Sequence, residues 1–346
     1  MFKKNPSKMN LKTPKDRKKI KVKHLIYVSI IYISFAYTFY YSMQNNDKIN
    51  NKEFINFLMN GGRVENLSNF KLNNIINTTM DFMLNIDFSN PATLLNASIL
   101  SQNKAIVETI KLEHNDDYSN VEELKEISEY IEDPNPIDIN NPKIYIYNTH
   151  QLENYNNKNL EIYGITPNVL MASYILKEKL NKLGIATIVE DTNLHEFLNV
   201  NGWDYSSSYK ATRLLILDKK NKYSSLEYFI DIHRDSVAKN LTTVSIDGKS
   251  YAKVLFVVGL EHDNYNANLN FANNINSLLE EYYPNISRGV LKKEGAGVDG
   301  IYNQDLSSNS LLIEVGGVDN NIEEVFNTIE AISVILNHYI NGDKNE

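Results

Sequence analysis

Three apolar segments of the chain carry side chains that can bind a metal ion or move a proton. The segment IYIYNTHQLENY contains His150 and Glu153, the segment YFIDIHRD contains His233, and the segment LLIEVGG contains Glu314. Zinc-dependent hydrolysis needs about three protein ligands of the histidine and carboxylate type, with one position left for water. It also needs a separate carboxylate that carries protons. The four residues supply both parts.

Each of these residues has a plainer alternative role. A single histidine at a strand end more often caps the strand or lies on the surface, but His150 and His233 follow two strands in the same way, which favours a metal. Glu153 could orient a histidine ligand instead of binding metal, and Glu161 is then the competing third ligand. Glu314 is costly inside an apolar strand unless it is paired or functional. We expect it to be functional.

Polar residues near these positions are candidates for substrate binding. Asp231 lies two residues before His233, hence on the same face of the strand, and Arg234 and Asp235 follow it. These residues could orient metal ligands, bind a substrate group, or form a structural ion pair. Asn303, in the polar stretch GIYNQD, could line the same site or belong to an ordinary loop.

The elements that must position this site alternate between strands and helices after Pro142. Apolar runs predict strands at 143–147, 185–189, 228–232, 253–258 and 311–315, and helical spacing predicts helices at 168–183, 205–217, 267–283 and 323–339. This alternation predicts an α/β domain with a mostly parallel, helix-covered sheet. Ligands of such sheets bind beyond the carboxyl ends of the strands, which is where the two histidines are expected.

The N-terminal region has a different composition. Residues 1–24 hold ten Lys or Arg and one acidic residue, and residues 25–43 hold no charged residue. A helix of that length spans roughly 28 Å, close to the thickness of a bilayer core. Bulky residues where a signal peptide would be cleaved favour an uncleaved transmembrane anchor over a cleaved signal. The positive-inside rule then predicts a cytoplasmic tail at 1–24 and an extracytoplasmic chain from about residue 45 onward.

The extracytoplasmic part divides into two expected regions. Residues 44–141 are polar and asparagine-rich, typical of a spacer with short helices such as 53–59 and 121–131, and residues 142–342 form the expected catalytic domain. Removing the tail's net +9 from the chain's −8 leaves −17 outside, which argues against a nucleic-acid partner. The chain has no cysteine, so its core rather than disulfides must stabilise it.

With these motifs in place, the chain resembles the stage II sporulation protein P family, membrane-anchored cell-wall hydrolases of spore-forming bacteria. The resemblance covers about residues 143–340 and rests on six stretches in order: THQLENY, FIDIHRDS, GKSYAKVLFVVGLEHDNY, SRGV, YNQDLS and LLIEVGGVDN. More broadly, the domain is similar to zinc-dependent N-acetylmuramoyl-L-alanine amidases. The resemblance implies a zinc amidase-like α/β fold, with His150 and His233 as zinc ligands and Glu314 as the catalytic acid and base.

Two positions depart from the pattern that the resemblance implies. The wider amidase group takes a glutamate ligand just before the helix that follows the first histidine, but this chain reads GITPNV there, with Asn168 and no glutamate. The third ligand is then Glu153 or Glu161, and Glu153 is preferred because it belongs to the motif. Asn148 stands where many members carry another histidine.

The resemblance implies peptidoglycan hydrolysis by a zinc-activated water. The bonds would be the N-acetylmuramoyl-L-alanine amide and stem-peptide cross-links. The setting would be engulfment during sporulation, in the intermembrane space of the sporangium, with stage II sporulation proteins D and M as partners. The alternatives are a non-catalytic membrane-anchored scaffold and a zinc carboxypeptidase of another fold, in which Arg213, Arg234 or Arg288 would clamp a terminal carboxylate.

Overall fold

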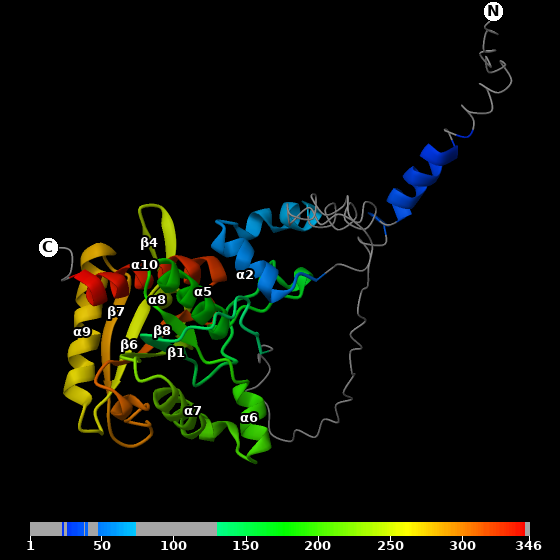
Figure 1. Cartoon of the computed structure of the whole chain (residues 1–346). Helices are drawn as coiled ribbons and strands as arrows, with labels where there is room; N and C mark the ends of the chain where they lie inside the picture. Colours follow the sequence, from blue (N-terminus) through cyan, green and yellow to red (C-terminus); the bar gives the residue numbers. More distant parts are fainter. Residues whose placement is uncertain (1–22, 24–25, 38, 41–47, 74–129, 343–346) are drawn as a thin grey trace, which may run out of the picture. The chain divides into compact units, whose positions relative to one another are not determined.

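The computed structural model describes residues 23, 26–37, 39–40, 48–73 and 130–342 (Figure 1). The chain divides into two compact units, one of Met1–Asp47 and Leu67–Glu113, the other of Lys48–Asn66 and His114–Glu346. Apart from residue 23, the expected basic tail lies outside the described residues. The same holds for the helix expected at 121–131, apart from its last two residues.

The described part of the first unit includes a helical segment at residues 26–37. Its apolar side chains are exposed, among them Ile30, Ile31 and Ile33. Within the part of the chain that the structure describes, we find no helix with the length and apolar character needed to cross a bilayer. Of the anchor expected at 25–43, residues 25, 38 and 41–43 are outside the described residues.

A six-stranded sheet forms the centre of the second unit, in the order β2-β1-β3-β8-β6-β7. The strands are β1 (Ile144–Tyr147), β2 (Thr187–Val189), β3 (Tyr228–Asp235), β6 (Val254–Gly259), β7 (Ser287–Lys293) and β8 (Ser310–Gly317). Neighbouring strands are parallel except β6 and β8, which are antiparallel. The prediction of a mostly parallel α/β sheet is therefore confirmed, with β6 and β7 running against the other four strands.

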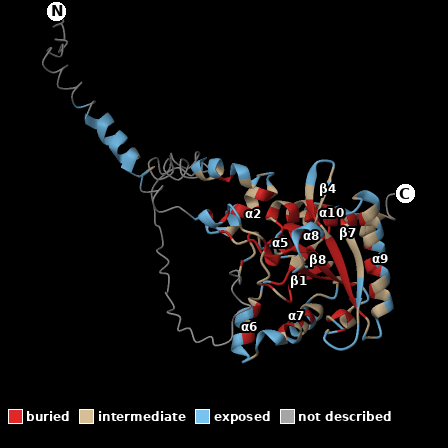
Figure 2. Cartoon of the chain, turned by 180° about the vertical axis from the view of Figure 1, so that it is seen from behind, coloured by how far each residue is buried: buried red, intermediate tan, exposed pale blue. Residues whose placement is uncertain are grey.

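Helices accompany this sheet, and buried residues gather in the strands and in the helix faces that meet them (Figure 2). The helices are α2 (Asn51–Met59), α5 (Val169–Lys182), α6 (Leu194–Val200), α7 (Ser208–Lys222), α8 (Lys239–Thr242), α9 (Tyr265–Tyr282) and α10 (Ile322–Asn341). Because the chain passes from β1 to β2 through α5 and returns to β3 through α7, right-handed crossovers place these two helices on opposite faces. β1 and β6 are buried along their whole length, as strands covered on both faces are.

Local signals set the ends of the helices that frame the sheet. α5 begins after Asn168, whose side chain accepts a hydrogen bond from the Met171 backbone N–H at 3.1 Å, and it ends before Gly184, which has a φ of +82°. α10 begins with a capping box formed by Asn321 and Glu324. Every strand and helix predicted between residues 143 and 339 is present, with ends that differ by a few residues.

The sequence prediction missed α6, α8, β7 and a hairpin formed by β4 (Thr243–Ile246) and β5 (Lys249–Ala252). The hairpin turns at Asp247 and Gly248, with φ of +51° and +78°, so the Asp-Gly pair was a usable signal. β7 pairs with β6 alone and lies at the edge of the sheet, so its sequence carries no continuous apolar run. α6 has seven residues, too few for a clear helical period.

Residues 48–66 and 130–141 belong to the same compact unit as the sheet, although both ranges fall within the spacer expected at 44–141. In α2, Phe54 and Leu58 are buried, and α2 contacts α5. Lys177 of α5 forms an ion pair with Asp133 at 2.6 Å, and its side chain is 3% exposed. The unit that carries the catalytic candidates therefore begins well before residue 142.

Candidate functional site

The carboxyl ends of three adjacent parallel strands bring the predicted residues together. His233 in β3 and Glu314 in β8 are register partners, so their side chains lie on the same face of the sheet. His150 follows β1, and its ring meets the ring of His233 edge-on, with the centroids 5.2 Å apart and an interplanar angle of 84°. The two histidines and the glutamate, 164 positions apart in sequence at their extremes, are thus neighbours in the fold.

Glu153 joins this group through a tight turn after β1. Its backbone N–H donates to the His150 carbonyl at 3.1 Å. Its carboxylate oxygen Oε2 lies 3.5 Å from His233 Nδ1 and accepts a hydrogen bond from the Arg234 backbone N–H at 2.9 Å. Glu161, the competing candidate, starts the short 3₁₀ helix η2 (Glu161–Tyr163) and is exposed. Of the two glutamates, the structure puts Glu153 beside the histidines.

Asp231 faces the other side of the His233 ring. Its Oδ1 lies 3.0 Å from His233 Nε2, and the residue is 1% exposed. Thr149 donates to this carboxylate twice, from its backbone N–H at 2.9 Å and from its hydroxyl at 2.6 Å. Two donors from the loop after β1 thus fix a buried carboxylate against the His233 imidazole, which makes Asp231 an orienting residue.

Asn148, which stands where many relatives were expected to carry a histidine, has a structural role. Its side-chain amide donates to the Ile232 carbonyl at 2.6 Å and accepts from the Ser173 hydroxyl at 2.9 Å. It therefore links the end of β1 to β3 and to α5.

The charges of the cluster are balanced between His233 and the carboxylates. Burial alone lowers the pKa of His233, but Asp231 and Glu153 outweigh burial and raise this pKa well above its usual value. Burial raises the pKa of Glu153, but the charge and hydrogen bond of His233 outweigh it, so this pKa lies below its usual value. Burial, followed by the charge of His233, lowers the pKa of His150 to about 4. His150 is therefore neutral at pH 7, the form in which an imidazole binds metal.

Glu314 has the properties of a group that exchanges protons at neutral pH. Burial raises the pKa of its carboxyl to about 7, with His233 opposing this rise and Glu153 adding to it. Its Oε2 atom is buried and makes no hydrogen bond to any described residue. A carboxyl with a pKa near the working pH can accept a proton and then give it back.

The raised pKa of Glu314 predicts a pH dependence of folding stability. The folded state holds this proton more tightly than the unfolded state, so the stabilisation is present below about pH 4.5 and is lost as the pH rises through about 7. Glutamine at this position has no proton to lose. In the absence of metal, we therefore expect the free energy of unfolding of wild type to fall by about 2 to 3 kcal/mol relative to that of Glu314→Gln between pH 5 and pH 8. Urea unfolding of both proteins in chelator measures this difference, and parallel pH curves would contradict it.

Arg234 and Asp235 end β3 beside the cluster, and both have partners within the chain. Arg234 Nε donates to the Asn154 carbonyl at 3.0 Å. Asp235 forms an ion pair with Arg288 at 2.7 Å, at a shift in the pairing of β3 with β8. Contacts of these two residues with substrate stay a prediction.

Asn303 is 5% exposed and ties a loop to α7. Its side-chain amide donates to the Tyr209 carbonyl at 2.9 Å and to Thr212 Oγ1 at 3.1 Å. Both hydrogen bonds are internal, so the role in substrate binding predicted for Asn303 also remains a prediction.

Two tyrosines that the sequence prediction missed flank His150. The Tyr205 ring stacks on the His150 ring with centroids 5.0 Å apart, and the Tyr209 ring meets it edge-on at 5.7 Å. Their spacing of four residues at the start of a predicted helix places them on one side of a helical turn. That spacing is the signal that could have identified them.

The donor atoms of the cluster suit zinc in type and burial. His150 Nδ1 is a buried nitrogen that makes no hydrogen bond to the described residues, whereas Nε2 and Nδ1 of His233 face the carboxylates of Asp231 and Glu153. Within the described ranges, however, no three His, Cys, Asp or Glu side chains converge on one metal position. His233 instead lies between Asp231 and Glu153 in an ion-paired arrangement. His150, His233 and Glu153, which would hold zinc, therefore lie close together, but their side chains are oriented toward one another and toward Asp231 and not toward a shared metal position.

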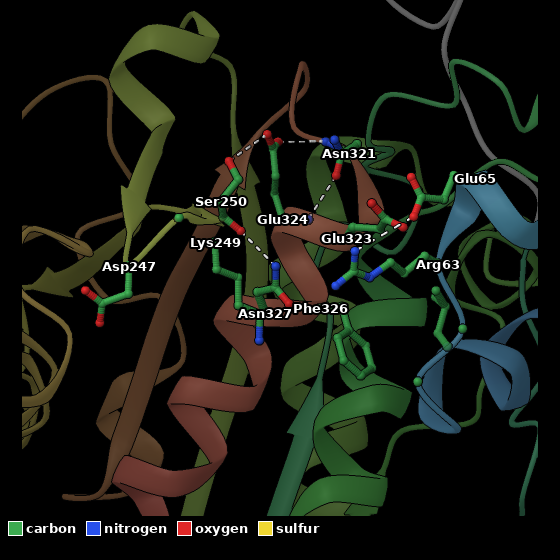
Figure 3. Close-up of a pocket in the computed structure, with 14 residues that line it drawn as sticks. Arg63, Glu65, Asp247, Lys249, Ser250, Asn321, Glu323, Glu324, Phe326 and Asn327 are labelled. Atoms are coloured by element: carbon green, nitrogen blue, oxygen red, sulfur yellow. Dashed lines mark hydrogen bonds and ion pairs between the residues drawn. The ribbon is translucent and has the colours of Figure 1, made fainter.

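A cavity of about 600 Å³ lies elsewhere in the unit, lined by the η1 turn (Val64–Asn66), the β4–β5 hairpin and the first turn of α10 (Figure 3). None of the candidate site residues is among the described residues that line it. Its cationic side chains have acidic neighbours, Arg63 with Glu65 at 3.8 Å and Lys249 with Glu330 at 3.2 Å.

Comparison with known proteins gives the chain its relatives. Residues 46–337 match the family model for Stage II sporulation protein P (SpoIIP). The chain is 37% identical over 200 residues to Stage II sporulation protein P of Bacillus subtilis (strain 168). That match covers 56% of this chain and 50% of the relative, so it spans half of the relative's length.

Two solved structures are similar at 14% identity. The structure of the CwlD amidase from Clostridioides difficile in complex with the GerS lipoprotein has a TM-score of 0.40, covering 58% of this chain and 100% of that one. Cwp6 from Clostridium difficile has a TM-score of 0.36, and the match covers 59% of this chain and 30% of Cwp6. The family match extends over most of the chain and includes every strand of the sheet. The chain therefore belongs to the stage II sporulation protein P family.

Proposed function

We propose that this chain is a peptidoglycan hydrolase that cleaves the N-acetylmuramoyl-L-alanine amide, and stem-peptide cross-links, during engulfment in sporulation. The observation that carries the proposal is Glu314. Its Oε2 atom is buried, its pKa is raised to about 7, and it lies beside the His150–His233 pair at the carboxyl ends of three parallel strands. Membership of the stage II sporulation protein P family supports the biological setting.

The proposal includes a zinc ion held by His150, His233 and Glu153. When bound, zinc would lower the pKa of a water molecule from about 15.7 toward about 7 and would polarise the carbonyl of the scissile amide. Asp231 would keep the His233 ring in place, since Thr149 fixes its carboxylate with two hydrogen bonds.

Glu314 would carry the proton through the reaction. The ionised carboxylate takes a proton from the attacking water as the new carbon–oxygen bond forms. It then gives this proton to the nitrogen as the carbon–nitrogen bond breaks, which leaves a carboxylic acid and an amine. A pKa near 7 suits both transfers, because neither form of Glu314 is strongly favoured at neutral pH.

The location of the protein is part of the same proposal. Residues 25–43 would form a single membrane anchor and residues 1–24 a cytoplasmic tail. Of the expected spacer at 44–141, residues 48–66 belong to the compact unit that carries the catalytic candidates. The remainder of that range would carry this unit to the wall in the intermembrane space. The exposed apolar side chains at 26–37 support an apolar environment for that segment. Stage II sporulation proteins D and M would be partners. Membrane fractionation with protease protection would test this topology.

The decisive experiment uses the full chain in detergent micelles with zinc and purified peptidoglycan. Mass spectrometry of the products identifies the bond: intact stem peptides indicate the amidase reaction, and separated cross-linked dimers indicate the endopeptidase reaction. A non-catalytic scaffold would release neither, and that result would contradict the proposal.

The assignment of the third ligand makes a separate prediction. Glu153→Gln should lower zinc affinity by more than the roughly 10- to 100-fold expected for a residue that only orients a ligand. Glu161→Gln, the matched control on the exposed η2 turn, should bind zinc like wild type. Competition with a fluorescent zinc chelator measures both affinities. Equal affinities of Glu153→Gln and wild type would remove Glu153 from the ligand set.

A further inference from the structure

Three tyrosines and His150 form a continuous row of rings, in which His150 lies between Tyr205 and Tyr209. Tyr205 stacks on the His150 ring, Tyr209 meets that ring edge-on, and Tyr302 meets Tyr209 edge-on with centroids 5.5 Å apart and an interplanar angle of 73°. Tyr205 and Tyr209 come from the turn at the start of α7, whereas Tyr302 comes from the loop before η4 (Gln304–Leu306). We call Tyr205, Tyr209 and Tyr302 the tyrosine wall.

The backbone at Tyr302 is held in an unfavourable conformation. Tyr302 and Asn303 have φ of +53° and +56°, the one pair of consecutive non-glycine residues with positive φ among the described residues. The Tyr302 backbone N–H donates to Asp299 Oδ1 at 2.5 Å, and the Asn303 side chain donates to the Tyr209 carbonyl at 2.9 Å. Such conformations persist only where surrounding contacts impose them, and they cluster at functional sites. These contacts hold the Tyr302 ring against Tyr209.

A polar network joins this loop to the candidate metal ligands. From Asn303 the contacts run to Thr212 Oγ1 at 3.1 Å, from Thr212 to Thr149 Oγ1 at 3.3 Å, and from Thr149 to Asp231 Oδ2 at 2.6 Å. Asp231 in turn contacts His233. The tyrosine wall and the catalytic candidates are therefore connected through one chain of polar contacts.

The tyrosine wall keeps surface available to a ligand. Tyr205 is 42% exposed, and Tyr209 and Tyr302 are half-buried. Burial raises the pKa of Tyr302, and the carboxylates of Asp299 and Glu314 add to this rise, so its hydroxyl stays neutral at pH 7. Neutral phenol rings have electron-rich faces and hydroxyl rims. These fit the C–H face and the hydroxyl groups of a sugar ring better than the charged groups of a stem peptide.

We propose that the tyrosine wall binds the glycan part of the substrate, the sugar next to the scissile amide, and that Tyr302 is its positioning residue. This inference rests on the proposed function for the identity of the substrate. It explains why a strained loop tied to α7 lies beside the histidine and glutamate cluster. Held by its sugar, the amide would be presented to Glu314 in one orientation.

Binding of denuded glycan tests the inference apart from hydrolysis. Strands of alternating N-acetylglucosamine and N-acetylmuramic acid without stem peptides contain no bond for an amidase, so calorimetry with the full chain in detergent reports binding alone. We expect Tyr302→Ala to raise the Kd about tenfold, and Tyr302→Phe, which keeps the ring, to raise it about twofold. Tyr282→Ala, at an exposed tyrosine of α9, is the matched control and should bind like wild type.

Further readouts separate positioning from a purely structural role. With muropeptide substrates, Tyr302→Ala should raise KM about tenfold and change kcat by less than about threefold. Tyr205→Ala, at the most exposed residue of the wall, should weaken glycan binding without the loop change that could disturb folding. Equal Kd values for wild type, Tyr302→Ala and Tyr205→Ala would overturn the inference, as would wild type that binds no glycan. Tyrosine-dependent glycan binding by a protein that cleaves no peptidoglycan would instead leave this inference standing and overturn the proposed function.

Discussion

Glu314→Gln is expected to lower kcat/KM for peptidoglycan hydrolysis by about 10²- to 10⁴-fold while zinc stays bound, because a positioned proton carrier contributes an acceleration of that size. Glutamine has nearly the same volume, so the apolar strand around it keeps its packing. Its amide cannot accept the proton of the attacking water or return it to the leaving amine. The measurement combines product release from purified peptidoglycan with zinc content by atomic emission.

The position of Glu314 beside His233 makes this a strong test. The residue pairs in register with His233 and is held in an environment that raises its pKa to about 7. Glu281→Gln, on the exposed side of α9, is the matched control and should hydrolyse like wild type. Wild-type rates for Glu314→Gln would show that the proton is carried by another group.

His233→Ala is expected to remove zinc binding and hydrolysis together. The residue is 3% exposed and lies between Asp231 and Glu153, so its loss leaves a buried and a half-buried carboxylate without this cationic or metal-binding partner. We expect the fall in zinc affinity to exceed the roughly 100-fold upper range for residues that only orient ligands. Hydrolysis at a fixed low zinc concentration should fall with it.

Thermal unfolding gives a readout of metal binding that does not depend on activity. Zinc should raise the Tm of the wild-type full chain, and chelator should reverse the rise, because a ligand of the folded state stabilises it. The Tm of His233→Ala should respond to neither. His195→Ala, at an exposed histidine of α6, is the control and should keep the wild-type response. A zinc-dependent Tm in His233→Ala would exclude His233 as a ligand.

Much of the fold followed from local sequence patterns. The apolar runs of β1, β3 and β8 and the helical spacing of α5, α9 and α10 were sufficient to predict those elements, because burial on both faces of a sheet, or on one face of a helix, imposes its own period. The elements that were missed lack such a period. β7 lies at the edge of the sheet, α6 is short, and the β4–β5 hairpin pairs outside the main sheet.

The sequence alone determined which residue types end the strands, and therefore that His150, His233 and Glu314 were the chemical candidates. Only the tertiary structure decided how they meet. The register of β3 with β8 puts His233 beside Glu314, and the turn after β1 brings Glu153 rather than Glu161 to the histidines. The same packing uses the amide of Asn303 in an internal hydrogen bond and places the ring of its neighbour Tyr302 against Tyr209. The reason is physical: a local period encodes burial, whereas a contact between side chains depends on strand order and register, which arise from the packing of the whole domain.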